Sequence, residues 1–111
     1  MPHCIIEYSE GLEASLLNNT VYDATLASGL FSADGKDIKV RAVAYTDFRL
    51  ADQSDSFIHV TVRIMPGRSQ QQKADLSERV LDALQALEMS RITLTVEVSD
   101  IAADTYRKHI G

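Results

Sequence analysis

A proline directly after the initiator methionine is the first residue whose type suits chemistry. If Met1 is trimmed, Pro2 carries a free secondary amine, and an α-amino group has an ordinary pKa of about 8. Burial or a nearby cation lowers the pKa of such an amine, because both disfavour its protonated form. An amine that titrates near pH 7 is a good general base. Two readings remain open: many chains begin Met-Pro without any catalytic role, and while Met1 is attached the Pro2 nitrogen is an amide without basicity.

Three cations have positions that suit the binding of carboxylates. Arg68 stands immediately before an expected helix, where free backbone N–H groups and the guanidinium together favour an anion. Lys39 and Arg41 are two positions apart, so both project from one face of an expected strand. These cations would bind an acid with more than one carboxylate and stabilise an enolate as its charge develops. Taken singly, such residues usually serve solubility.

Histidine and cysteine add little chemistry to this pattern. The three histidines, at positions 3, 59 and 109, show no ligand spacing, so we expect no metal. Cys4 is the only cysteine; it excludes an intrachain disulfide and fits a small buried side chain in a reducing cytoplasm.

Length and charge narrow the class of protein. A chain of 111 residues suits one domain, which we assign to residues 1–111 with an arm over 99–111. The net charge of −5 argues against a nucleic-acid partner but allows a small anionic ligand held by local cations. We expect a cytoplasmic protein without a membrane partner, because no apolar run approaches membrane-spanning length and no secretory signal opens the chain.

Hydrophobic periodicity predicts two helices and four strands. The strands are expected near residues 2–8, 37–48, 57–65 and 91–98, and the helices near 10–28 and 70–88. Ser9 is the expected N-cap of the first helix. Ser69 and Gln72 form a capping-box pattern for the second. The tail from residue 99 is expected to form a short helical turn or an arm.

The element order, β-α-β twice, predicts an α+β fold in which a four-stranded sheet carries both helices on one face, like a ferredoxin-like sandwich. The other face is expected to mix apolar with basic side chains: Lys39, Arg41, Val43, Tyr45, His59, Thr61 and Arg63. This mixture predicts oligomerisation through the face or its edges, with cations lining a cavity; the alternative is a solvated face. Glu7 is expected to pair with Arg41 or Arg63.

Two motifs carry a resemblance to a known family. The opening Met-Pro-His-x-Ile-Ile-Glu-Tyr-Ser and the corner Ile64-Met65-Pro66-Gly67-Arg68-Ser69 resemble the tautomerase superfamily. The similarity is closest to 5-carboxymethyl-2-hydroxymuconate isomerase and extends over nearly the whole chain.

The resemblance implies a homotrimer of double β-α-β subunits and a cofactor-free isomerase of aromatic catabolism. Pro2 matches the catalytic proline, which would move a proton from the dienol hydroxyl of a muconate-type di- or tricarboxylate to carbon. Such a substrate arises by ring cleavage of homoprotocatechuate. Arg68 matches a carboxylate ligand, and Lys39 and Arg41 fall among basic residues of the second strand. Lys39 stands where an arginine is expected; the charge is kept, but the bidentate geometry is lost.

Two alternatives stay open at this point. The same fold and proline would serve a tautomerase of another small enol acid, such as a phenylpyruvate-like enol. A trimeric binding module without chemistry would also fit the fold.

Overall fold

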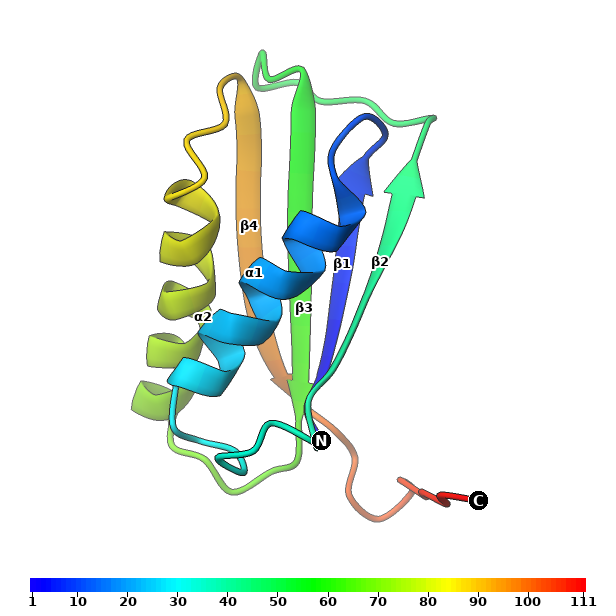
Figure 1. Cartoon of the computed structure of the whole chain (residues 1–111), viewed down its shortest axis with the longest axis vertical. Helices are drawn as coiled ribbons and strands as arrows, with labels where there is room; N and C mark the ends of the chain where they lie inside the picture. Colours follow the sequence, from blue (N-terminus) through cyan, green and yellow to red (C-terminus); the bar gives the residue numbers. More distant parts are fainter.

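Six elements follow one another in the order that the sequence predicts (Figure 1). The computed structural model describes all residues, 1–111. The first half contains β1 (His3–Ser9), α1 (Ala14–Ala27) and β2 (Lys39–Tyr45), and the second half contains β3 (Ser56–Ile64), α2 (Gln70–Gln85) and β4 (Ile92–Asp100). The duplicated β-α-β order is therefore confirmed.

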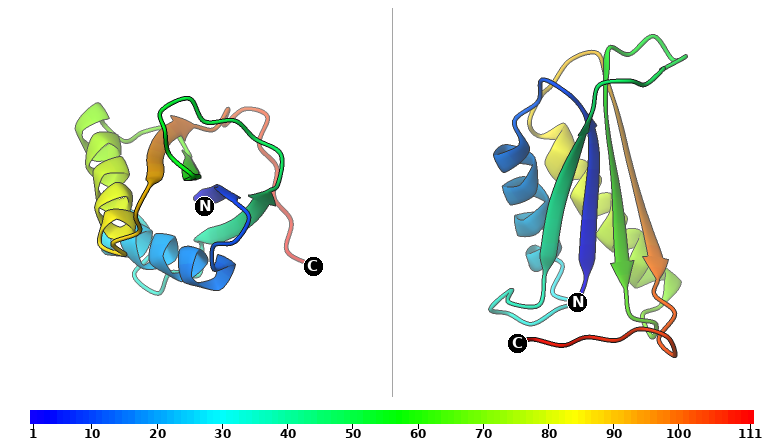
Figure 2. Two further views of the ribbon diagram at one scale, coloured as in Figure 1. Left: turned by 90° about the horizontal axis from the view of Figure 1, so that it is seen from above. Right: turned by 90° about the vertical axis from the view of Figure 1, so that its right-hand side faces the viewer.

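The four strands form one sheet in the order β2-β1-β3-β4. Each half contributes a parallel pair, and the halves meet where β1 runs antiparallel to β3. Both helices lie on one face of this sheet (Figure 2), which confirms the α+β sandwich. Because β1 and β3 run in opposite directions, the chain start, the beginning of β2 and the ends of β3 and β4 all lie at one end of the sheet.

Alternating strand residues build the core under the helices. Cys4 and Ile6 of β1 face this side, and their neighbours His3, Ile5 and Glu7 face the other. Each fully buried aliphatic side chain contributes about 1.5–3 kcal/mol to the free energy of unfolding. The side chains that meet between the two layers include Ile58, Val60, Val62, Leu17, Val21, Leu76, Val80 and Leu84.

The first helix begins later than predicted. Its N-cap is Glu13, and Ser9, the expected cap, is still part of β1. The Ser9 hydroxyl is bound to the neighbouring strand instead: it accepts from the backbone N–H of Phe57 at 3.1 Å and donates to the Phe57 carbonyl at 3.4 Å. Gly11 then takes a left-handed conformation with φ of 104°, which separates the strand from the helix.

The second helix begins where the capping box predicts. The Ser69 hydroxyl accepts from the backbone N–H of Gln72 at 3.1 Å, and the Gln72 side chain accepts from the Ser69 N–H at 2.9 Å. Both bonds satisfy helix N–H groups that have no partner within the helix. They also fix the backbone directly after Arg68.

The tail after β4 forms an arm and not a helix. Ile101 is buried beside the end of β3, where its N–H donates to the Ile64 carbonyl at 2.7 Å. From there the arm crosses the end of the sheet at which the chain starts (Figure 2). Neither helix of the fold is long and apolar enough to span a membrane.

Candidate functional site

The chain start is pinned to the beginning of β2. The Pro2 ring is buried, and the Pro2 carbonyl accepts from the backbone N–H of Lys39 at 3.0 Å. The Met1 amine donates to the Asp37 carbonyl at 2.5 Å. With Met1 attached, the Pro2 nitrogen is an amide, and the only amine at this end is that of Met1.

Lys39 lies beside this amine. Its Nζ atom donates to the same Asp37 carbonyl at 3.4 Å. Burial, followed by the charge of Lys39, holds the pKa of the Met1 amine below its ordinary value of 8.0, although Asp37 opposes the shift. This end of the sheet therefore shifts the equilibrium of an amine toward its uncharged form.

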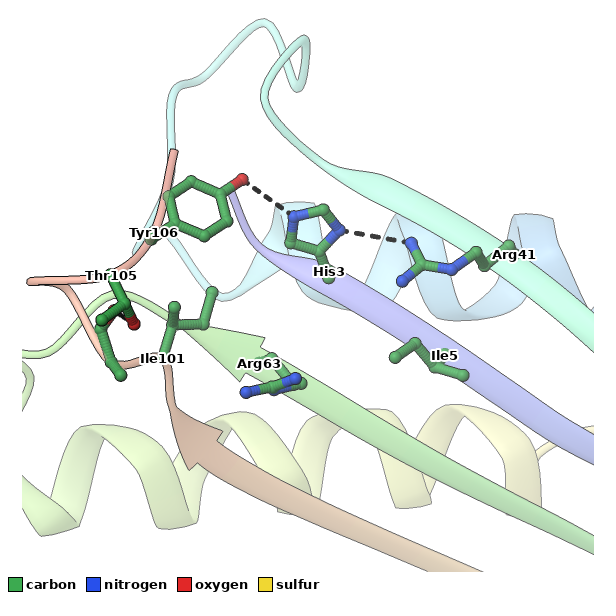
Figure 3. Close-up of a pocket in the computed structure, with 8 residues that line it drawn as sticks. His3, Ile5, Arg41, Arg63, Ile101, Thr105 and Tyr106 are labelled. Atoms are coloured by element: carbon green, nitrogen blue, oxygen red, sulfur yellow. Dashed lines mark hydrogen bonds between the residues drawn. The ribbon is translucent and has the colours of Figure 1, made fainter. Parts of the chain in front are cut away.

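A cavity of about 330 Å³ opens on the face of the sheet that the helices leave uncovered (Figure 3). Its floor consists of strand residues: His3 and Ile5 from β1, Arg41 from β2 and Arg63 from β3. The C-terminal arm supplies the remaining lining, namely Ile101, Ala102, Thr105 and Tyr106. The lining contains two arginines and no carboxylate.

His3 joins the arm to one of these arginines. Its Nδ1 atom lies 3.2 Å from Nη1 of Arg41, and its Nε2 atom lies 3.0 Å from the Tyr106 hydroxyl (Figure 3). A guanidinium can only donate, so Nδ1 accepts, and the proton of the neutral ring must lie on Nε2. Burial, Arg41 and Lys39 all lower the pKa of His3, in that order, which favours this neutral form.

Arg68 lies apart from the cavity. Its Nη2 donates to the Leu30 carbonyl at 2.7 Å, and its guanidinium stacks 5.1 Å from the centre of the Phe31 ring. The arginine therefore tethers the corner before α2 to the loop after α1. Both segments lie at the sheet end where the chain starts (Figure 1).

Of the four residues that the sequence marks for the site, Lys39 is the one that lies against the chain start, next to Pro2. Arg41 lies in the cavity two residues along β2, and Arg68 lies elsewhere at the same sheet end. The expected ion pair between Glu7 and an arginine is wrong, because Glu7 accepts from the Tyr45 hydroxyl instead.

Sequence reasoning missed the arm as a wall of the cavity, and it missed the roles of Tyr106 and Arg63 there. The one available signal was Tyr106, the only Phe, Tyr or Trp in the tail. The alternation of the third strand predicts the correct face for Arg63, but it does not predict that Arg63 lines a cavity together with Arg41.

Comparison with known proteins settles the family. The family model of 5-carboxymethyl-2-hydroxymuconate isomerase matches residues 2–110. The chain belongs to this family. It is thus an isomerase with the tautomerase fold, which favours an enzyme over a binding module without chemistry. No curated protein sequence matches the chain.

Solved structures agree with the fold of this family. A crystal structure of 5-carboxymethyl-2-hydroxymuconate delta-isomerase superposes with a TM-score of 0.76 at 22% identity, covering 100% of this chain and 89% of that one. A 5-carboxymethyl-2-hydroxymuconate isomerase from Deinococcus radiodurans R1 gives 0.72 at 25% identity, with 99% and 90% covered. A fused 4-OT, solved as a symmetric trimer, gives 0.74 at 22% identity, with 89% and 85% covered.

Proposed function

We propose that this isomerase converts the dienol of 5-carboxymethyl-2-hydroxymuconate to its keto isomer, with the amino-terminal nitrogen of Pro2 as the base. The supporting observation is the environment of the chain start, where burial and Lys39 lower the pKa of an amine. Removal of Met1 transfers the amine to Pro2, which is pinned to the same strand by its carbonyl. The proposal includes a cytoplasmic role in the degradation of homoprotocatechuate.

The reaction is a proton transfer within one substrate. The Pro2 nitrogen takes the proton of the dienol hydroxyl, and the O–H electron pair forms the carbonyl. The electrons of the conjugated double bonds shift toward carbon, which then takes the proton back from the prolinium. One O–H bond breaks and one C–H bond forms, so no cofactor is needed. Positioned acid–base groups of this kind contribute about 10²–10⁴-fold in rate.

Cations at this sheet end bind the substrate carboxylates. Lys39 is the nearest to the base, and Arg41 projects from the same strand face. Arg68 adds a third positive charge at the corner before α2. Cationic groups that are held in place before the reaction stabilise the negative charge that develops on the dienolate oxygen.

We also propose that the chain assembles as a homotrimer through the open face of the sheet. Val43 and Phe48 keep 49% and 40% of their surface exposed, which is costly for large apolar side chains. Phe48 packs edge to face on Phe57, with the ring centres 5.2 Å apart, so exposed apolar side chains gather at the end of the sheet that is remote from the cavity. Val43→Asp is expected to yield monomers in analytical ultracentrifugation, and an unchanged mass would contradict the interface.

Turnover by the Pro2→Ala variant tests the base. We expect kcat to fall by about 10²–10⁴-fold with the dienol of 5-carboxymethyl-2-hydroxymuconate. Pro66→Ala, which changes the only other proline, is the control and should keep its activity. The intact mass of each preparation must show that Met1 is absent. Wild-type rates in Pro2→Ala would exclude Pro2 as the base, and faster turnover of a phenylpyruvate enol would exclude the proposed substrate.

A further inference from the structure

The cavity beneath the C-terminal arm contains positive charge without a counterion. Arg63 forms no hydrogen bond or ion pair, and the only side-chain partner of Arg41 is the neutral ring of His3. Elsewhere on the surface Arg91 pairs with Asp55, and Lys73 pairs with Asp100. No carboxylate of the chain neutralises either cavity arginine, so both can bind an anionic ligand.

The shape of the cavity suits an organic acid better than an inorganic ion. A volume of about 330 Å³ is at the lower end of the range for small-molecule sites. Ile5 and Ile101 give it an apolar wall, while Arg41 and Arg63 supply guanidinium groups from two strands. Guanidinium groups bind carboxylates with two parallel hydrogen bonds, which orients the ligand as well as attracting it.

The arm forms one side of this cavity. Tyr106 donates or accepts only through its hydroxyl, and that hydroxyl is bound to His3, which in turn orients Arg41. Tyr106, which lines the cavity from the arm, is therefore linked to one of the charged groups of the cavity (Figure 3). Without the arm, His3 would lose its contact with Tyr106 and would orient Arg41 less firmly. The cavity would also lose the apolar wall that Ile101 supplies.

We propose that this cavity binds a carboxylate of the substrate through Arg63 and Arg41, with His3 and Tyr106 as the residues that position Arg41. The inference rests on the proposed function, because it names the groups that hold one end of the same substrate. It adds Arg63, Tyr106 and His3 to a site otherwise built from Pro2 and the three cations marked by the sequence.

Binding of cis,cis-muconate, a dicarboxylate that has no enol to turn over, tests the cavity by calorimetry. Arg63→Gln is expected to raise Kd at least tenfold, about 1.4 kcal/mol. Arg49→Gln removes the same charge from the exposed loop between β2 and β3, at the other end of the sheet, and should leave Kd unchanged. Equal affinities of Arg63→Gln and wild type, or no binding by wild type, would overturn the proposal.

The Pro2→Ala variant separates this proposal from the proposed function. It is expected to bind muconate as wild type does while losing turnover. If binding depends on Arg63 but turnover does not depend on Pro2, the carboxylate site stands and the proposed base fails. If turnover depends on Pro2 but muconate binding ignores Arg63, the base stands and the cavity proposal fails.

Positioning by His3 has a test of its own. The amide of His3→Gln offers both an acceptor for Arg41 and a donor for Tyr106, whereas the phenyl ring of His3→Phe offers neither. We expect glutamine to keep the muconate affinity and phenylalanine to weaken it. Equal affinities of the two variants would show that His3 does not position Arg41.

Discussion

The hydroxyl of Tyr106 lies 3.0 Å from Nε2 of His3, although the two residues are 103 positions apart in the chain. The two rings also meet edge to face, with their centres 6.0 Å apart. This contact fixes a tail that has no helix or strand of its own. The shape of the cavity therefore depends on both ends of the chain.

Tyr106→Phe should loosen the arm. The change removes one neutral hydrogen bond, worth about 1 kcal/mol, and keeps the ring. We expect faster hydrogen exchange over residues 101–108 with little change in the core strands. Tyr22→Phe is the control, because the Tyr22 hydroxyl forms no hydrogen bond in the structure. Equal exchange of the arm in wild type and Tyr106→Phe would contradict the contact.

The stability of the fold should carry a pH dependence that originates at His3. Its pKa is lowered from 6.5 by burial, Arg41 and Lys39, and Arg63 and the Met1 amine add to the shift. The unfolded chain therefore binds the proton more readily, so stability is full above pH 6.5 and falls as pH drops below it. Denaturation of wild type and His3→Gln should diverge below that pH. Parallel curves down to pH 5 would contradict the neutral tautomer.

Lys39 should set the pKa of the chain-end amine. Lys39→Met removes a cation that lowers this pKa, so the amine should titrate at a higher pH in the variant. Titration of the Met1 amine by NMR measures the effect directly, and a trimmed chain should show the same direction at Pro2. Lys36→Met is the control, since Lys36 is exposed and pairs with Asp34 at 3.8 Å.

Arg68 should contribute to stability as well as to charge. Arg68→Met keeps the apolar stem but loses the bond to Leu30 and the contact with Phe31. A charged donor and a cation–π contact together are worth about 2 kcal/mol. Urea denaturation measures the loss, and an unchanged midpoint would show that solvent replaces both contacts.

Ser69→Ala should cost about 1 kcal/mol, because it removes the capping bond to Gln72. Ser77→Ala within the exposed part of α2 is the matched change, and alanine favours a helix interior there. A greater loss in Ser77→Ala than in Ser69→Ala, by thermal denaturation, would contradict the role of the cap.

Alternating patterns were the part of the fold that the sequence predicted well. Strict alternation placed Lys39 and Arg41 on one face of β2, and the pairing of β1 with β2 confirms this. The capping box at Ser69 placed the start of α2 to the residue. Both signals are local, since they depend on residues within one element or one turn.

Long-range contacts were beyond sequence reasoning. Ser9 had the side chain of a helix cap, but the backbone of Phe57 competes for its hydroxyl from another strand. The partner of Glu7 was mistaken because a tyrosine on β2 reaches it first. The cavity exists only because the arm returns across the sheet, and the tail has no periodic pattern that predicts this path.

The fusion of both β-α-β halves into one chain limits how many terminal amines this duplicated fold can hold. The counterpart of β1 in the second half is β3, which starts at Ser56 at the opposite end of the sheet. Ser56 lies in mid-chain, so its nitrogen is always an amide. Because both halves are translated as one chain, two β-α-β repeats share a single amino-terminal amine. Two halves translated separately would have two such amines.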